Sequence, residues 1–356
     1  MRDILEGWQA RLREAHAAKS PLAIRGGGTK AFYGGPVQGA PFDTREYAGI
    51  VDYEPTELVV TARAGTPLAE VQQTLAASGQ MLAFEPPHFA PGATIGGTVA
   101  AGLSGPRRPY AGAVRDHMLG VRIVDGCGQL LTFGGQVMKN VAGFDVTRLV
   151  TGSLGTLGIV AEASIKCLPV PRTEATRAYE MSADEGIRLV NEWGGKPLPL
   201  SATCWVDGRL FVRLSGAAPA VEAAAAKLGG DVVDADAAPW TAVRDHTHPF
   251  FDAAHAGAPL WRLSVRSTAP YADLGSGPLI EWGGALRWIV APRAEPAKLR
   301  AWAAANGGHA TLFTGGDRVA GVFHPLPPAL AALHARLKAE FDPHGILNPG
   351  RMAGQF

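Results

Sequence analysis

The chain has 356 residues, 47% of them hydrophobic and 18% charged, with a net charge of +1. This length allows about two domains with a substantial core, and the near-neutral charge excludes nucleic acid as the main partner, because that partner demands a strongly basic face. Cys127, Cys167 and Cys204 show neither metal-ligand spacing nor an even-numbered disulfide framework, so we expect a reducing compartment.

The first predicted element is an amphipathic helix over residues 3–18, where Ile4, Leu5, Trp8 and Leu12 recur at helical spacing. This charged segment lacks the apolar centre of a signal peptide, and no run reaches the roughly 18 apolar residues that span a bilayer. We therefore expect a cytoplasmic protein that meets the inner membrane only indirectly, as a peripheral component held by partner subunits.

Short strands and turns follow this helix as far as residue 171. Thr66 and Pro67 begin a helix that ends near Gly79, with Thr66 as its N-cap. Residues 139–145 predict a turn and the start of a helix. The predicted strands of this part are 21–24, 49–53, 58–63, 81–84, 121–124, 130–133 and 159–168, with a β-hairpin between the two runs that flank residues 125–128.

The second half changes character after Pro169 and Pro171, which mark the predicted domain boundary. Strands there alternate with alanine-rich helices, a pattern that favours an α+β domain with an antiparallel sheet. The expected strands are 202–206, 210–214, 261–266 and 285–290, and the expected helices are 219–228, 296–306 and 329–341.

Three glycine-rich segments predict a site for a large cofactor that carries phosphates. A strand-like run leads into residues 25–30, whose three glycines and threonine can form a nest of backbone N–H groups for an anion. In the second segment, residues 84–105, Gly96 and Gly97 open a helix whose unpaired N–H groups suit a pyrophosphate. The third segment, residues 150–160, predicts a turn that feeds a buried strand. Neither the NAD-type glycine fingerprint nor a Walker loop is present.

Six motifs in order resemble the vanillyl-alcohol oxidase and p-cresol methylhydroxylase (PCMH) type of FAD-binding proteins. Within that superfamily, residues 244–251, 261–264 and 282–284 make the chain similar to the FAD-binding subunits of bacterial glycolate oxidases. The motifs are RGGGTK, PGATIGGTVAAGLSG, RDHMLGVRIVDGCGQLL, KNVAGFD, GSLGTLGIV and FDPHGILNPGRM. The resemblance implies an α+β fold: a two-part PCMH-type FAD-binding domain at residues 1–172, a smaller α+β cap with an antiparallel sheet at 173–335, and a tail at 336–356 that returns to the flavin.

The resemblance also implies which residues hold the flavin, without a covalent bond, because the RGGGTK loop contains neither His nor Cys. It places the pyrophosphate on the first glycine loop, the ribityl chain and phosphates on the second segment, the adenine side near Ile159 and the isoalloxazine edge near Asn348. The loop of Arg115 leaves two interpretations open: a solvated loop, or a cation for a phosphate or substrate anion. The expected FAD-binding residues are Arg25, Gly26, Gly27, Gly28, Thr29, Lys30, Pro91, Thr94, Gly96, Gly97, Ala100, Gly102, Arg115, Gly155, Ile159 and Asn348.

Oxidation of a small 2-hydroxy acid needs a cation for the carboxylate, a base for the hydroxyl proton, and a hydride path to the flavin. The candidate cation is Arg262 or Arg266, and the candidate base is His248 or His324. Each of them has an ordinary structural interpretation as well, as a residue of an exposed strand or as a hydrogen-bonded histidine.

Two departures from the catalytic relatives keep alternatives open. Leu154 stands where those relatives carry Glu, and no histidines cluster to hold a metal, so we expect none. The first hypothesis is an FAD-bearing subunit of a glycolate dehydrogenase that works with a larger FAD subunit and an iron–sulfur subunit toward a quinone. The second is an architectural or electron-relay subunit whose paralogous partner performs catalysis. The third is a flavin reductase fed by a nicotinamide, which the missing NAD fingerprint disfavours.

Overall fold

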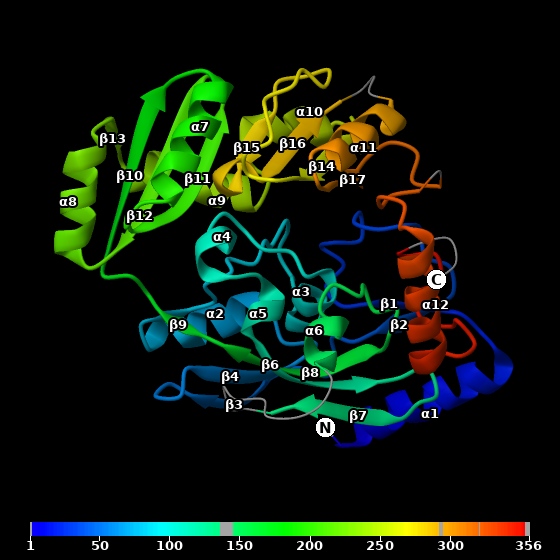
Figure 1. Cartoon of the computed structure of the whole chain (residues 1–356). Coiled ribbons are helices and arrows are strands. Elements are labelled where there is room, and N and C mark those ends of the chain that lie inside the picture. The colour runs from blue at the N-terminus through cyan, green and yellow to red at the C-terminus, as the bar shows by residue number, and fades with distance from the viewer. Residues whose placement is uncertain (1, 136–144, 292–294, 320, 353–356) are drawn as a thin grey trace. The chain divides into compact units, whose positions relative to one another are not determined.

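The computed structural model describes residues 2–135, 145–291, 295–319 and 321–352, and it divides into two compact units (Figure 1). The first unit comprises Met1–Leu103, Ala113–Pro169 and Arg318–Phe356, and the second comprises Ser104–Gly112 and Val170–Asp317. The turn and helix start predicted for residues 139–145 lie outside the described residues except for Asp145, whose side chain accepts a hydrogen bond from Arg148 N at 3.0 Å. Among the helices described, none combines the length and the apolar character required to cross a membrane.

A five-stranded antiparallel sheet forms the centre of the first unit, in the order β3-β4-β8-β6-β7. The predicted hairpin is confirmed, with Val124 opposite Leu130 in register. The middle strand β8 is buried at seven of its eight positions, because helices and loops cover both of its faces. The strands are β3 (Ile50–Glu54), β4 (Val59–Arg63), β6 (Met118–Val124), β7 (Leu130–Gly134) and β8 (Ile159–Lys166).

A second layer of the first unit carries the first glycine loop. Strand β1 (Leu22–Arg25) pairs in parallel with β2 (Ala40–Asp43), and Leu22 also forms a bridge with Leu347 near the other end of the chain. Beneath them, the predicted first helix is α1 (Arg2–Ala18), which buries the indole of Trp8. The remaining elements of this unit are α2 (Leu68–Ala77), α3 (Ile95–Ala101), α5 (Val114–His117), α6 (Val146–Val150), α12 (Pro328–Phe341), and the pair β5 (Gln80–Met81) and β9 (Leu168–Pro169).

Two local predictions in this unit are wrong. Helix α2 has Pro67 as its N-cap with no side-chain hydrogen bond, because the Thr66 hydroxyl instead bonds Gly49 N at 2.9 Å and Gly49 O at 3.1 Å. The strand expected at 81–84 is reduced to β5, since only two residues reach the backbone of β9.

The second unit is built on one eight-stranded sheet in which every pairing is antiparallel, as predicted for the second half of the chain. Together with the first unit, this sheet confirms the α+β class. In sheet order the strands are β13 (Asp231–Val233), β10 (Thr173–Glu180), β12 (Arg209–Gly216), β11 (Leu200–Val206), β15 (Leu279–Glu281), β16 (Leu286–Val290), β14 (Leu260–Ser264) and β17 (His309–Thr314). Its helices are α4 (Arg108–Ala111), α7 (Ala183–Gly194), α8 (Ala218–Leu228), α9 (Trp240–Arg244), α10 (Asp252–His255) and α11 (Pro296–Ala305).

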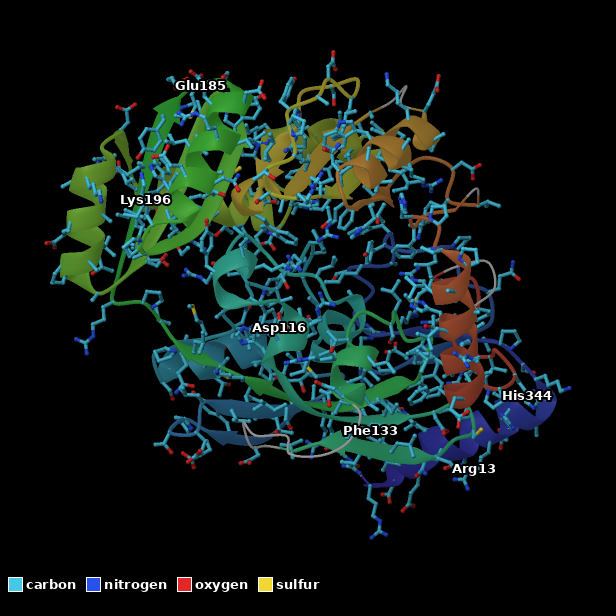
Figure 2. All side chains as sticks on the ribbon, in the orientation of Figure 1. Arg13, Asp116, Phe133, Glu185, Lys196 and His344 are labelled. Atoms are coloured by element: carbon cyan, nitrogen blue, oxygen red, sulfur yellow. The ribbon has the colours of Figure 1, made fainter. Side chains whose placement is uncertain are left out.

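Helix α7 begins with a reciprocal cap that yields a stability prediction. Ser182 Oγ accepts from Glu185 N at 3.4 Å, and Ser182 N donates to Glu185 Oε2 at 3.0 Å (Figure 2 labels Glu185). We expect Ser182→Ala to lower the free energy of unfolding by about 1 kcal/mol, because it removes the acceptor for one orphan N–H group. Urea unfolding measures the loss. The exposed Ser20, which lies outside any helix, is the control, and an equal loss for Ser20→Ala would contradict the capping argument.

Candidate cofactor site

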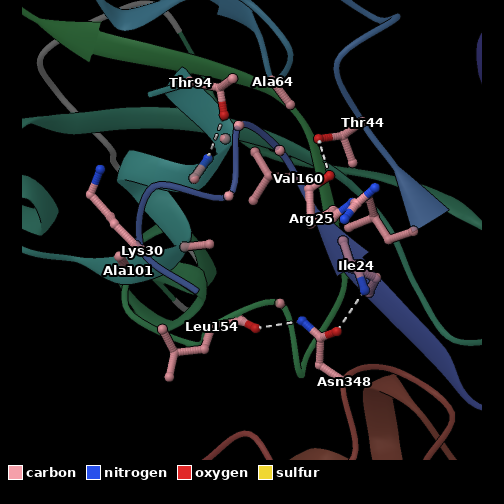
Figure 3. Close-up of a pocket in the computed structure, with 18 of the residues that line it drawn as sticks. Ile24, Arg25, Lys30, Thr44, Ala64, Thr94, Ala101, Leu154, Val160 and Asn348 are labelled. Atoms are coloured by element: carbon pink, nitrogen blue, oxygen red, sulfur yellow. Dashed lines mark hydrogen bonds between the residues drawn. The ribbon is translucent and has the colours of Figure 1, made fainter. Parts of the chain in front are cut away.

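A cavity of about 230 Å³ lies within the first unit, where segments far apart in sequence converge (Figure 3). The first glycine loop, the start of α3, the turn before β8, and residues of the C-terminal tail all contribute to its wall. The lining residues are Ala23, Ile24, Arg25, Gly26, Gly27, Gly28, Thr29, Lys30, Ala31, Val37, Thr44, Ala64, Thr94, Gly96, Gly97, Ala100, Ala101, Leu154, Gly155, Gly158, Ile159, Val160, Asn348 and Arg351.

The first glycine loop presents bare backbone to this cavity. Within the part of the chain that the structure describes, the N–H groups of Gly26, Gly27, Gly28 and Thr29 donate to no protein acceptor. A Cβ on Gly27 would lie only 1.7 Å from Gly92 O, so no other residue fits there. Unpaired N–H groups that converge on a concavity are what a phosphate binds, and the site therefore fits the diphosphate of a dinucleotide.

The start of α3 behaves differently from the prediction. Ile95 N donates to Thr66 O at 3.0 Å, Gly96 N to Ala64 O at 2.8 Å, and Gly97 N to the Thr94 hydroxyl at 3.3 Å. The expectation that this helix offers unpaired N–H groups to a pyrophosphate is therefore wrong. Because Thr94, Gly96 and Gly97 still line the cavity, this segment supplies a small-residue surface, and the N–H groups without a protein acceptor belong to the loop at 26–29.

Asn348 joins two walls of the cavity. Its Oδ1 accepts from Ile24 N at 2.7 Å, and its Nδ2 donates to Leu154 O at 2.8 Å (Figure 3). The side chain is 3% exposed, and the backbone φ angle is +45°. Leu154 also has a positive φ, +54°, a conformation that a branched side chain adopts only when its surroundings hold it there. The amide of Asn348 thus holds the turn before β8 against β1.

Cations surround the same cavity. Arg25, Lys30 and Arg351 line it, and the Arg351 guanidinium donates to the carbonyl oxygens of Lys30, Ala31 and Gly35 at 3.1 to 3.2 Å. Burial lowers the pKa of Arg351 to about 10, so it stays charged near neutral pH. Three cations favour an anionic ligand. The prediction missed Arg351, although its place directly after the Asn-Pro-Gly tail was a signal that could have found it.

Three predicted FAD-binding residues do not line this cavity. Pro91 and Gly102 are not among its lining residues, and Gly102 instead ends α3 with φ +63° and donates its N–H to Thr98 O. Arg115 lines a separate cavity of about 680 Å³ in the first unit, together with Arg148 and His334.

The three predicted catalytic side chains are spread over both units. Arg262 lies on β14 of the second unit, with its guanidinium carbon 5.1 Å from the Trp282 ring centroid. His248, in the same unit, accepts a hydrogen bond from Phe250 N at 3.2 Å through Nδ1, and burial lowers its pKa. His324 is half-buried in the first unit. Within the described residues, no group of three or more His, Cys, Asp or Glu side chains could hold a metal ion.

A buried histidine of the second unit yields a pH prediction. His246 stacks on Phe251 with ring centroids 4.0 Å apart and meets Trp288 at 4.5 Å. Burial lowers the pKa of His246 to about 3, so between that pH and about 6.5 the unfolded chain binds the proton more readily than the folded chain. We therefore expect stability to fall as the pH drops through this window, by up to about 1.4 kcal/mol per pH unit.

The matched variant is His246→Phe, which keeps a stacked ring and removes the titrating group. Urea unfolding between pH 4 and pH 7 compares it with the wild-type chain. We expect the variant to lose the contribution of His246 to the pH dependence of the free energy of unfolding. The strain of phenylalanine at a backbone φ of +57° should shift stability equally at every pH. The same slope in both chains would refute the assignment.

Comparisons with known proteins agree with this geometry. A family model described as an FAD binding domain matches residues 6–134, and one described as the C-terminal domain of FAD linked oxidases matches residues 320–352. The chain is 47% identical to glycolate oxidase subunit GlcE of Escherichia coli over 96% of this chain and 95% of that protein. It is 33% identical to glycolate oxidase subunit GlcD of Bacillus subtilis over 44% of this chain and 33% of that protein. A solved alkyldihydroxyacetonephosphate synthase shares the fold, with a TM-score of 0.66 at 15% identity over 97% of this chain and 75% of that one.

Fold, cavity and comparisons together define an FAD-dependent oxidoreductase with a PCMH-type FAD-binding domain. FAD is its cofactor, and the resemblance inferred from the six motifs is confirmed. Because the similarity extends over nearly the whole of both chains, the protein belongs to the family of the glycolate oxidase subunit GlcE.

Proposed function

We propose that the chain is the FAD-binding subunit of a complex that oxidises glycolate, or a closely related 2-hydroxy acid, to the 2-oxo acid. The observation that carries this proposal is the 47% identity to a glycolate oxidase subunit over 96% of this chain. A larger FAD subunit is one partner, in line with the match to a second glycolate oxidase subunit. An iron–sulfur subunit passes the electrons on toward a quinone, and the complex is cytoplasmic, bound at the membrane only through partners.

Different residues of the chain bind the cofactor and the substrate. The N–H groups of Gly26 to Thr29 bind diphosphate oxygens, with Arg25 and Lys30 nearby as counter-charges. When bound, FAD supplies a two-electron acceptor for the carbon that carries the hydroxyl group. Arg262 binds the substrate carboxylate, and His248 or His324 accepts the hydroxyl proton.

A second candidate function is an architectural or electron-relay subunit that performs no substrate turnover of its own. The observation that favours it is Leu154, which lines the FAD cavity at the position where catalytic relatives carry a carboxylate. A leucine there can pack against a ligand, but it can neither accept a proton from the ligand nor form a hydrogen bond with it. In this case the larger FAD subunit oxidises the substrate.

A visible absorption spectrum under anaerobic conditions tests both proposals. If the isolated, FAD-loaded chain loses its yellow colour on addition of glycolate, it turns over the substrate itself. If it responds only after the larger FAD subunit is added, the relay function holds. Arg262→Met is the matched variant: it should keep the flavin spectrum and lose the glycolate response. Rapid bleaching of the isolated chain by NADPH would contradict both proposals and support a flavin reductase.

A further inference from the structure

Helix α12 in the first unit buries a charged side chain and leaves two leucines exposed. Its one buried residue is Lys338, whose exposed fraction is 5%. Leu330 and Leu333 on the same helix are 45% and 42% exposed. Burying an ammonium group while leaving leucines in water is costly unless hydrogen bonds compensate the charge. The hydrogen-bond partners of Lys338 therefore indicate which segments this helix holds in place.

All three protons of the Lys338 ammonium have an acceptor. Nζ donates to Asp342 Oδ2 at 2.6 Å, to Thr156 O at 2.7 Å and to Leu347 O at 3.0 Å. An ammonium group has three donors, so this one is saturated. Burial lowers the pKa of Lys338, and the ion pair with Asp342 opposes that effect.

The Asp342 carboxylate completes the arrangement and is itself 1% exposed. Its Oδ1 accepts from Ile346 N at 3.0 Å, and its Oδ2 accepts from Leu347 N at 2.8 Å. The pair thus bonds both the N–H and the C=O of Leu347, which leaves the tail little freedom to move at that residue.

These bonds end on the two segments that close the FAD cavity. Thr156 directly follows Gly155 in the turn before β8, and Leu347 directly precedes Asn348; both Gly155 and Asn348 line the cavity. The ammonium group therefore bonds the backbone of the turn and the backbone of the tail at once. Both walls are therefore bonded to a buried charge that does not itself line the cavity.

We propose that Lys338 and Asp342 are a positioning pair for FAD: they hold the turn at 153–158 and the tail at 346–348 at the spacing that the cofactor requires. This inference rests on the FAD site and is independent of the substrate assigned under the proposed function. It is tested by FAD binding to the isolated chain, without glycolate. A failure of this inference can therefore be told apart from a failure of the proposed function.

The first test is Lys338→Met, which keeps the length of the side chain and removes its charge. We expect the dissociation constant for FAD to rise by about 10- to 100-fold, by analogy with the loss of a group that orients a metal-ligating residue, with a shifted visible band for the flavin that remains bound. Lys196→Met is the control. It breaks an ion pair of the same i,i+4 spacing, with Glu192 at 2.5 Å, but at an exposed site (Figure 2 labels Lys196). It should change neither quantity.

Two further measurements keep the inference testable if Lys338→Met does not fold. Lys338→Met/Asp342→Asn removes both charges and retains an acceptor for the N–H groups of the tail. A cooperative melt with wild-type FAD affinity and spectrum in either variant would overturn the proposal. In the wild-type chain without FAD, the amides of Ile346 and Leu347 should already exchange slowly with solvent, because the pair holds the tail before the cofactor binds, and rapid exchange of these two amides would equally overturn the proposal.

Discussion

Replacing Gly27 by alanine is expected to lower the affinity of the chain for FAD by about 100-fold, because relieving a backbone overlap costs about 3 kcal/mol. The added Cβ would lie 1.7 Å from Gly92 O and 2.6 Å from Gly92 C, and neither backbone atom can rotate out of the way. The loop must therefore move away from the segment before α3, and its N–H groups move with it. Quenching of flavin fluorescence during titration of the cofactor-free chain measures the affinity.

The control for this substitution is Gly7→Ala. Gly7 lies at an exposed position of α1, and a Cβ there would meet nothing within 4 Å. Alanine should raise the stability of this helix by about 0.5 to 1 kcal/mol and leave FAD affinity unchanged. Wild-type affinity in Gly27→Ala would show that the loop is not part of the site.

Replacing Asn348 by glycine is expected to lower the free energy of unfolding of the first unit by about 2 to 4 kcal/mol, because one buried and one partly buried backbone group lose their partners. These groups are Ile24 N–H and Leu154 C=O, bonded at 2.7 and 2.8 Å. Glycine keeps the positive φ that this position requires, so the loss reports the amide alone. The melting temperature of the first unit should fall by roughly 5 to 15 °C, which scanning calorimetry detects.

Asn306→Gly is the matched control for Asn348→Gly. The half-buried Asn306 amide donates one hydrogen bond, to Trp302 O at 2.9 Å in the second unit. Its loss should therefore cost less than that of Asn348. Asn348→Asp adds a sharper comparison, since it keeps an acceptor for Ile24 N–H but turns a carboxylate toward Leu154 O. Equal melting temperatures for the Asn348 variants and the wild-type chain would contradict the bridging role of Asn348.

The glycine loop at residues 26–29 could be predicted from sequence because its role depends on local backbone. Three glycines after a strand leave room for a nest whatever the rest of the fold does, and alternating apolar runs around residues 125–128 specify a hairpin by themselves. The start of α3 shows the limit of this reasoning. Its N–H groups are taken by Ala64 O and Thr66 O, which come from a strand end some thirty residues earlier.

The roles of Lys338 and Arg351 could not be predicted either, because they depend on contacts with residues far away in the sequence. Lys338 reaches Thr156 across 182 positions of the chain, so nothing local marks it as different from a surface lysine. Arg351 reaches Lys30 across 321 positions. Strand β10 was also missed, because its two buried positions are only Thr176 and Ala178 and its other side chains are half-buried or exposed, so it lacks a clear apolar run.

The bridge between Ile24 and Asn348 also determines when, during translation, the cofactor site can be completed. Its partners are 324 positions apart, and a ribosome adds that many residues in about 15 to 65 s. During this time the nascent chain carries the glycine loop but not the tail that completes its wall. The growing polypeptide therefore depends on other contacts to protect β1, and flavin capture must follow the emergence of residues 346–351.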